Sequence, residues 1–294
     1  MKSILEYYYN LNNVNILETS DRYFVECEEG SFIFEEYIYD FDELKKIVVL
    51  LNNSKVLYHL IVYTKEGEIF SLYDDKKYVL LKIRTTKEDK ISLFDFKNII
   101  VSGSLKWDEL WSNRIDYYET QVNEVIKEKN FKYSLQYYIG LTENAIAYVN
   151  VLNEKYKNNN LVYNVSHRYI DLPLDNITFY NPLNLIIDLD IRDFAEYVKN
   201  AFFNEILTNS EIIEIINSYN FSNESANYFF ARLLYPSYFF KYYDEYVETS
   251  ELNDNIFLII KKSSDFELLV KSIYNRLVIR YDIILDAWII KSQH

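Results

Sequence analysis

The part of the sequence that decides the fold reads Ser166-His-Arg-Tyr-Ile-Asp-Leu-Pro-Leu-Asp-Asn-Ile-Thr-Phe and then, after one tyrosine, Asn181-Pro-Leu-Asn-Leu-Ile-Ile-Asp-Leu-Asp-Ile-Arg-Asp-Phe-Ala-Glu-Tyr. It holds the second of three histidines and two of the three prolines in the chain. These residues stand between segments with helical periodicity, so the pattern predicts a loop, short strands and then the start of a helix. Any chemistry that the chain performs is expected here.

The same stretch supplies the residue types of a phosphotransfer site. Such a site uses a carboxylate to orient a hydroxyl, and an asparagine and an aspartate to hold magnesium. A histidine, an asparagine and several aspartates occur here at spacings compatible with that use.

The composition indicates a folded and strongly acidic protein. With 294 residues, 49% of them hydrophobic, the chain can bury a large core in one large or two modest domains. Its 31 basic and 45 acidic residues give a formal net charge of −14. This charge argues against a nucleic acid or an anionic membrane surface as partner, because phosphates would be repelled. A basic protein partner stays open.

Three further features of the sequence exclude classes of protein: the cysteine count, the N-terminus and the spacing of the glycines. A single cysteine, Cys27, excludes an internal disulfide framework and a cysteine-based zinc site, and it suits a reducing cytosol. The sequence contains neither a signal peptide nor a transmembrane run, so we expect a cytoplasmic protein. The glycines are too far apart for a glycine-rich phosphate loop: Gly30, Gly67, Gly103 and Gly140.

The segment up to Thr85 predicts a small mixed domain after a short helix over residues 1–12. Two aromatic and β-branched runs, 22–27 and 31–37, flank Glu28-Glu29-Gly30, which suits a hairpin turn with glycine at a positive φ. A helix at 42–52 and three strands within 60–84 complete the pattern. We therefore expect a first domain, residues 1–88, with a five-stranded antiparallel sheet plus one helix.

Beyond residue 88 the strands mostly stop and helical periodicity takes over. The clearest helix has one apolar stripe with spacings of three and four residues: Trp107, Trp111, Ile115, Tyr118, Val122 and Val125. Further helices are expected at 133–156, 192–207, 210–219, 225–248 and 264–292. Pro236 should interrupt the fourth of these. Residues 89–294 therefore form a second, helical domain, and the fold class is α+β.

A small mixed lobe before a larger helical lobe is the layout of the bilobal protein-kinase-like fold. Three segments carry a more specific resemblance: Trp107-Asp-Glu-Leu-Trp-Ser-Asn-Arg-Ile-Asp-Tyr-Tyr-Glu-Thr-Gln, Tyr137-Tyr-Ile-Gly-Leu-Thr-Glu-Asn-Ala-Ile and Asp190-Ile-Arg-Asp-Phe-Ala-Glu-Tyr-Val. They look like the spore-coat-associated kinase-like proteins of endospore-forming Firmicutes, which are similar to the aminoglycoside and choline phosphotransferases. The resemblance covers most of the chain and is strongest from 105 to 200.

Carried over residue by residue, the resemblance implies a candidate site. The phosphotransferase pattern places a catalytic Asp five positions before a metal-binding Asn, and Asp171 and Asn176 have that spacing. His167 stands at the histidine of the same loop. A second acidic metal ligand should follow on a short strand, where Asp188 or Asp190 stands.

The chain departs from the family pattern inside this stretch. Tyr169 occupies the place two residues after His167 where the pattern has an Asp. Arg192-Asp193 follows Asp188 almost directly, which leaves little room for a metal-binding loop. Arg192 is instead expected to hold Asp193 or the His167 loop in a buried ion pair.

Two further departures concern the nucleotide. The pattern expects a lysine on the third strand to hold the phosphates, whereas Glu35 and Glu36 stand there. The opening hairpin, which covers the nucleotide in the family, is expected to carry Glu28 and Glu29. Two carboxylates beside a triphosphate would repel it by about a few kcal/mol in a partly desolvated cleft.

Two hypotheses remain. In the first, the chain is a pseudokinase that acts as a binding or structural protein in sporulation, needs no cofactor, and has an unidentified protein partner and a place in the spore coat. Asp171 and Asn176 then only support the loop. In the second, it is a phosphotransferase that uses ATP and Mg²⁺ on a small molecule or protein, with Asp171 as the hydroxyl-orienting base and Asn176 with Asp188 as metal ligands. His59 is expected at the surface or a strand edge.

Overall fold

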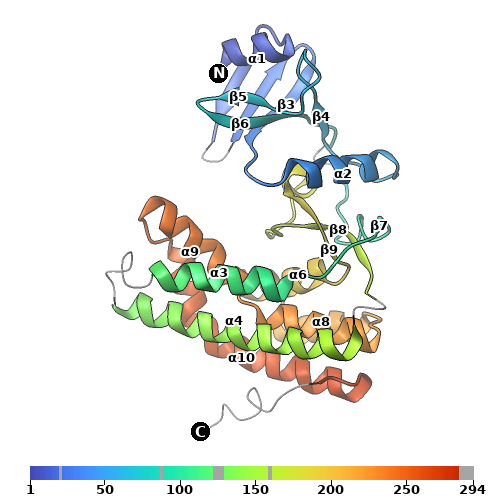
Figure 1. The fold of residues 1–294 in the computed structure, drawn as a ribbon, viewed down its shortest axis with the longest axis vertical. Coiled ribbons are helices and arrows are strands. Elements are labelled where there is room, and N and C mark those ends of the chain that lie inside the picture. The colour runs from blue at the N-terminus through green and yellow to red at the C-terminus, as the bar shows by residue number, and fades with distance from the viewer. Residues whose placement is uncertain (20–21, 87–88, 122–128, 158–160, 285–294) are drawn as a thin grey trace. The chain divides into compact units, whose positions relative to one another are not determined.

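The computed structural model describes residues 1–19, 22–86, 89–121, 129–157 and 161–284, and it confirms the predicted α+β fold class (Figure 1). The chain divides into two compact units. The first comprises Met1–Ile100, Asn164–Arg168 and Leu174–Ile187, and the second comprises the remaining residues. This division differs from the predicted one into 1–88 and 89–294, because residues 89–100 and two later segments belong to the first unit.

A six-stranded sheet forms the centre of the first unit. Its strands are β1 (Asn15–Glu18), β2 (Arg22–Cys27), β3 (Gly30–Glu36), β4 (Leu60–Val62), β5 (Ser71–Tyr73) and β6 (Lys76–Lys82). Their order is β1-β2-β3-β6-β4, with β5 also paired to β6, and the paired strands are antiparallel. The predicted hairpin turn between β2 and β3 is confirmed, and Gly30 has a φ of 128° there, which favours glycine.

Strand β1 is an addition to the predicted five strands. It is a four-residue edge strand whose side chains are mostly exposed, so no buried alternation marks it in the sequence. Its presence shifts the strand count, because the turn with Glu28 and Glu29 now joins the second and third strands. Glu28 and Glu29 lie in the predicted turn between β2 and β3, and β1 pairs with β2 ahead of it.

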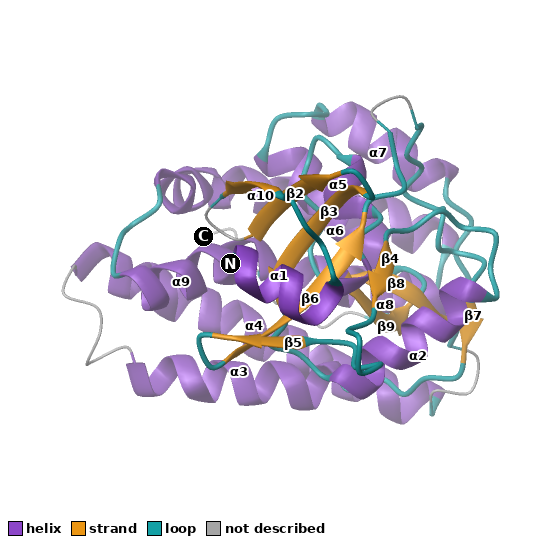
Figure 2. Cartoon of the chain, turned by 90° about the horizontal axis from the view of Figure 1, so that it is seen from above, coloured by secondary structure: helices purple, strands orange, loops and turns teal. Residues whose placement is uncertain are grey.

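Helices cover both faces of this sheet. Figure 2 shows β2, β3 and β6 side by side with α1 (Lys2–Tyr9) across them. Leu5 and Tyr9 of α1 pack on one face of the sheet with Val25, Phe32, Phe34 and Leu80. The predicted second helix, α2 (Phe41–Asn52), packs on the other face through Leu44 and Val48, against Ile33, Val79 and Leu81. Successive side chains of a strand point to opposite faces of the sheet, so each strand contributes to both hydrophobic cores.

His59 lies in the core of the first unit, and the expectation of a surface position is wrong. Its side chain is 0% exposed. Its Nε2 lies 3.2 Å from the carbonyl oxygen of Ile177, and its Nδ1 accepts the backbone N–H of Arg84 at 3.4 Å. These partners suit a neutral imidazole that carries its proton on Nε2. Burial lowers the pKa of His59 to about 4.

The stability of the protein should therefore fall as the pH drops from about 6.5 to about 4. The pKa of His59 is lower in the folded than in the unfolded state, so the unfolded state takes up the proton first, and the contribution is full above 6.5. At most roughly 3 kcal/mol is lost, since one pKa unit corresponds to about 1.4 kcal/mol. Urea unfolding of wild type and His59→Gln across this pH range checks it, and parallel pH profiles of the two proteins would refute it.

Helices make up most of the second unit. They are α3 (Trp107–Gln121), α4 (Lys129–Tyr156), α6 (Arg192–Phe203), α7 (Asn209–Ser218), α8 (Asn223–Leu234), α9 (Ser237–Thr249) and α10 (Asp254–Arg280). The predicted stripe on α3 is confirmed at Trp107, Trp111, Ile115 and Tyr118, which are all buried, whereas Val122 and Val125 lie outside the described residues. Pro236 separates α8 from α9, as predicted. Helix α10 begins ten residues before the predicted start at 264 and ends at Arg280. The predicted end at 292 is wrong, because residues 281–284 are not helical.

The stretch from Ser166 to Tyr197 forms the expected loop, short strands and helix start. A second sheet has the order β7 (Ile100–Val101), β8 (Tyr163–His167), β9 (Leu185–Leu189). Between β8 and β9 come the short helix α5 (Asn176–Phe179) and a 3-10 turn, η1 (Pro182–Asn184). The chain passes between the two units several times here, so its candidate residues are divided between them.

Within the described ranges, every helix is either too short or too polar to cross a bilayer.

Candidate functional site

The carboxylate of Asp188, near the end of β9, is fully engaged inside the second unit. Its Oδ1 accepts hydrogen bonds from Trp107 Nε1 at 2.9 Å and from the backbone N–H of Leu189 at 2.7 Å. Its Oδ2 accepts from Arg192 Nη1 at 2.6 Å and from Trp107 Nε1 at 3.1 Å. A carboxylate has about four lone-pair sites, so these donors use all of them. Asp188 is 8% exposed and joins β9 to the first residues of α3 and α6.

This anchor lies beside a buried charge cluster made by Glu196, Lys199 and Arg232. One oxygen of Glu196, Oε1, accepts from Lys199 Nζ at 2.8 Å and from Arg232 Nε at 2.6 Å. The other oxygen accepts from the hydroxyl of Ser237 at 2.7 Å. Lys199 Nζ also donates to the carbonyls of Arg232 and Tyr235, both at 3.1 Å. The cluster thus links α6 and α8 to the start of α9.

The electrostatics of the cluster favour a permanently ionised glutamate. Burial alone would raise the pKa of Glu196, but Lys199 and Arg232 outweigh it and hold the pKa well below its usual range. Burial lowers the pKa of Lys199, against the opposite effect of Glu196. The guanidinium of Arg232 also lies 5.3 Å from the ring of Trp107, so the cluster and the Asp188 anchor share one aromatic wall.

Asp171 belongs to the second unit and pairs with a lysine of α9. Lys241 Nζ donates to Asp171 Oδ1 at 2.6 Å. The side chain of Asp171 is 52% exposed. Burial would lower the pKa of Lys241, but the carboxylate of Asp171 outweighs this effect and the pKa is raised. A hydroxyl that approached Asp171 would therefore share its carboxylate with a cation.

Asn176 belongs to the first unit, where it opens α5 after the N-cap residue Asp175. Its Nδ2 donates to the carbonyls of Thr86 at 2.6 Å and Asp89 at 3.2 Å. Its Oδ1 is buried and has no hydrogen-bond partner among the described residues. The residue lines a cavity of about 590 Å³ together with Thr85, Thr86, Asp89, Ile91, Leu174, Asp175 and Ile177. The amide nitrogen of Asn176 is thus committed to the chain, while its oxygen remains a candidate acceptor or ligand.

His167, at the end of β8, packs into the core of the first unit. It is 1% exposed, and its Nε2 lies 3.0 Å from the carbonyl oxygen of Phe179. Its ring centroid lies 4.2 Å from that of Phe179 and 5.2 Å from that of Phe96. These contacts hold the start of the loop in place.

The neighbouring Arg168 forms an ion pair within the first unit. Its Nη2 donates to Glu43 Oε2, on α2, at 2.8 Å, and its guanidinium stacks on the ring of Tyr39 at 4.1 Å. The other oxygen of Glu43 accepts the backbone N–H of Ile187 at 3.3 Å. Glu43 therefore ties α2 to the strands on either side of the α5 loop.

The two glutamates at the end of β3 have partners as well. Glu35 Oε2 accepts from Asn181 Nδ2 at 2.9 Å and lies 3.8 Å from Arg22 Nε. Glu36 pairs with Lys76 of β6 at 2.7 Å. No lysine occurs in β3, whose sequence is Gly-Ser-Phe-Ile-Phe-Glu-Glu.

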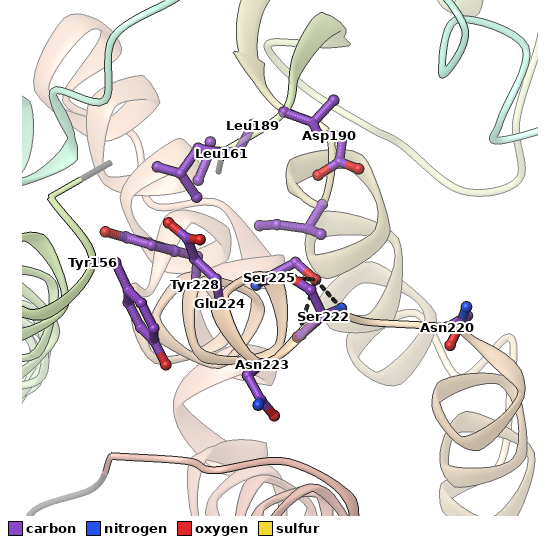
Figure 3. Close-up of a pocket in the computed structure, with 12 residues that line it drawn as sticks. Tyr156, Leu161, Leu189, Asp190, Asn220, Ser222, Asn223, Glu224, Ser225 and Tyr228 are labelled. Atoms are coloured by element: carbon purple, nitrogen blue, oxygen red, sulfur yellow. Dashed lines mark hydrogen bonds between the residues drawn. The ribbon is translucent and has the colours of Figure 1, made fainter. Parts of the chain in front are cut away.

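Asp190 lies apart from the Asp188 anchor and lines a different pocket of the second unit, of about 510 Å³ (Figure 3). This pocket is bounded by the first turn of α8, where Ser222 and Ser225 form a reciprocal cap, and by Tyr156. Glu224 is its second acid, and its described lining residues include no Lys, Arg or His. Asp188 and Asp190 thus lie in two different environments of the second unit.

The predicted site residues are divided between the two units. Arg192 forms a buried ion pair as expected, but its partner in this pair is Asp188, whereas the sequence predicted Asp193 or the His167 loop. His167 and Asn176 belong to the first unit, and Asp171, Asp188 and Asp190 to the second. Within the described part of the chain, no three His, Cys, Asp or Glu side chains are grouped as a metal site would need.

Two residues of this region were not singled out from the sequence as site residues. Trp107 is predicted only as part of an apolar stripe, although a buried indole N–H needs an acceptor and so points to a buried polar group. Lys241 lies 70 residues after Asp171, and nothing in the sequence relates the two. Such pairings come from packing alone.

Comparison with known sequences points to one family. A model of the family described as "Spore coat putative kinase YutH" matches residues 2–273 of this chain. A curated relative, the endospore coat-associated protein YutH of Bacillus subtilis (strain 168), is 26% identical over 228 residues, which are 67% of this chain and 66% of that protein. The match therefore covers slightly less than two thirds of the length of that relative.

Solved structures with a similar fold are small-molecule phosphotransferases. An aminoglycoside phosphotransferase from Alicyclobacillus acidocaldarius subsp. acidocaldarius DSM 446 superposes with a TM-score of 0.58 at 8% identity, covering 95% of this chain and 96% of that one. The choline kinase LicA from Streptococcus pneumoniae gives a TM-score of 0.51 at 12% identity, covering 92% and 97%. At these identities the likeness concerns the fold alone, and it confirms the predicted kinase-like architecture.

Proposed function

Because this chain belongs to the YutH family of spore coat kinase-like proteins, we propose that it is a pseudokinase that serves as a binding or structural protein of the spore coat. In this proposal it has the fold of a phosphotransferase without the transfer reaction, and its partner is another protein.

The observation that carries the proposal is the ion pair between Glu43 and Arg168. Kinases of this architecture hold the nucleotide phosphates with a lysine on the third strand, which a glutamate of the following helix keeps in place. Here the third strand, β3, ends in Glu35 and Glu36. The glutamate of the following helix, Glu43, is bound to Arg168 at 2.8 Å. The pair stabilises the loop and engages the glutamate that would hold such a lysine.

The residues present also fit magnesium poorly. A metal ligand needs free oxygen lone pairs, and Mg²⁺ demands near-octahedral oxygen coordination. The carboxylate of Asp188 already accepts four hydrogen-bond contacts from three donors, one of them a guanidinium. The proposed function therefore includes no phosphotransfer step through ATP and magnesium.

The alternative function is phosphotransfer, and two observations favour it. Asp171 is half exposed, as a hydroxyl-orienting base needs to be. The Oδ1 of Asn176 has no hydrogen-bond partner among the described residues and could serve as a ligand. In this case Lys241 would have to release Asp171 when substrate binds.

Adding ATP and Mg²⁺ separates the two proposals. We expect no change in melting temperature at millimolar nucleotide, because the phosphates would find no lysine on β3. A ligand at 100 times its Kd would add about 2.7 kcal/mol of stability. The measurement is a thermal melt of the wild type with and without ATP·Mg²⁺, with Asp171→Asn as the matched variant. A saturable rise in the wild type accompanied by substrate phosphorylation that Asp171→Asn abolishes would establish the alternative.

A further inference from the structure

We propose that Arg192 is a built-in counter-ion that takes the place of a divalent metal ion at Asp188. This inference rests on the proposed function, since a working phosphotransferase would need that carboxylate for magnesium. It concerns only residues of the second unit.

The first step of the argument is the geometry at the carboxylate. Arg192 Nη1 lies 2.6 Å from Asp188 Oδ2, and the arginine is the fourth residue after the aspartate. Both side chains are about nine-tenths buried, at 11% and 10% exposure. A charge-assisted hydrogen bond of this length in such a place is strong. A metal ion would have to displace the guanidinium.

The second step is the charge balance around the pair. The pair itself contains one buried acid, Asp188, and two further buried acids of α6, Asp193 and Glu196, lie near Arg192. The cations Arg192, Lys199 and Arg232 face them, and Arg192 interacts with all three acids. The six groups are neutral together when all are ionised. A divalent ion would add two uncompensated charges to a buried region, which is strongly unfavourable.

The third step is the role of Trp107. Its indole N–H bridges both oxygens of Asp188, at 2.9 and 3.1 Å, and its ring stacks on Trp111 with centroids 5.2 Å apart. This large apolar wall and the bridging donor hold the carboxylate in the one orientation that Arg192 neutralises. The region is therefore built for an internal cation.

Removing the arginine should accordingly create a metal site. The probe is Mn²⁺ alone, without nucleotide, and the free ion is followed by electron paramagnetic resonance during titration. We expect Arg192→Met to bind Mn²⁺ roughly tenfold or more tightly than the wild type. The gain should vanish in the double variant Asp188→Asn/Arg192→Met. Arg276→Met, which removes an exposed arginine of α10, is the matched charge control and should show no gain.

Each outcome decides the matter. The proposal fails if Arg192→Met binds Mn²⁺ no better than Arg276→Met, or if wild type already binds Mn²⁺ at a site that Asp188→Asn removes. If Arg192→Met folds poorly, its melting temperature is followed instead: Mn²⁺ should raise it more than that of Arg276→Met, and equal shifts refute the proposal. Arg192→Lys, which keeps the charge, should show no gain. This titration contains no ATP, so its result does not depend on nucleotide binding. The pseudokinase proposal is tested separately, by the thermal melt with ATP·Mg²⁺.

Discussion

Replacing Glu196 by glutamine is expected to lower the free energy of unfolding by about 3–5 kcal/mol, the loss typical of breaking a buried ion pair from one side. Glu196 accepts from Lys199 at 2.8 Å and from Arg232 at 2.6 Å, and Lys199 is 0% exposed. Without the carboxylate, Lys199 and Arg232 lose the counter-ion that both of them bind directly in the core. Leaving a buried charge uncompensated is among the most destabilising changes that a single substitution makes.

Urea unfolding followed by tryptophan fluorescence measures this loss, with a linear extrapolation to water. Glu214→Gln is the control, since Glu214 is exposed on α7 and its neutralisation should change stability by only about 0.5 kcal/mol or less. The double variant Glu196→Gln/Lys199→Met should lose less than the sum of the two single losses, because one orphaned cation is removed. A loss below about 1 kcal/mol for Glu196→Gln would contradict the role of the cluster.

Asp188→Asn is the second large effect, with an expected loss of about 3–5 kcal/mol. The amide would leave Arg192 without its carboxylate and would place an NH₂ group against the indole N–H or the guanidinium. The sign of the change in the free energy of unfolding distinguishes a structural anchor from a metal ligand. A carboxylate kept for a metal repels neighbouring acids in the metal-free protein, so its neutralisation would stabilise that protein.

Asp171→Asn provides the matched comparison. Asp171 also pairs with a cation, Lys241 at 2.6 Å, but its side chain is half exposed. Exposed ion pairs contribute only about 0–1 kcal/mol, so this variant should unfold close to wild type. Both variants are measured by urea unfolding without added metal. Equal losses for the two, or a gain for Asp188→Asn, would show that Asp188 is not a structural anchor.

Local sequence patterns predicted the elements whose own residues specify them. The stripe of Trp107, Trp111, Ile115 and Tyr118 marks one buried face of α3, and all four side chains are buried. The hairpin around Gly30 is marked by its turn chemistry, and the break at Pro236 by the missing backbone N–H. Strand β1 escaped prediction because an exposed edge strand has no periodic burial to reveal it. Such a strand exists because its neighbour β2 offers hydrogen bonds.

The candidate site was predicted as a set of residue types, and its geometry was not. The sequence places an Asp, an Asn and two more Asp within one short stretch. It cannot show that Asn176 donates to Thr86 and Asp89, or that Asp190 faces another pocket than Asp188. Those arrangements depend on which distant segments lie beside the loop.

By itself, the sequence determined the α+β class, the order of a sheet-rich and a helix-rich part, the absence of a lysine on the third strand and the family resemblance, which the comparisons confirm. The class, the order of the parts and the missing lysine are properties of local composition or periodicity, whereas the resemblance rests on similarity of particular segments to a known family. Only the tertiary structure decided the partners of the charged groups: Trp107 and Arg192 for Asp188, Arg168 for Glu43, and Lys241 for Asp171. The physical reason is that a charge in a folded core takes whichever counter-charge packing brings within about 3–4 Å, and sequence distance has no part in that choice.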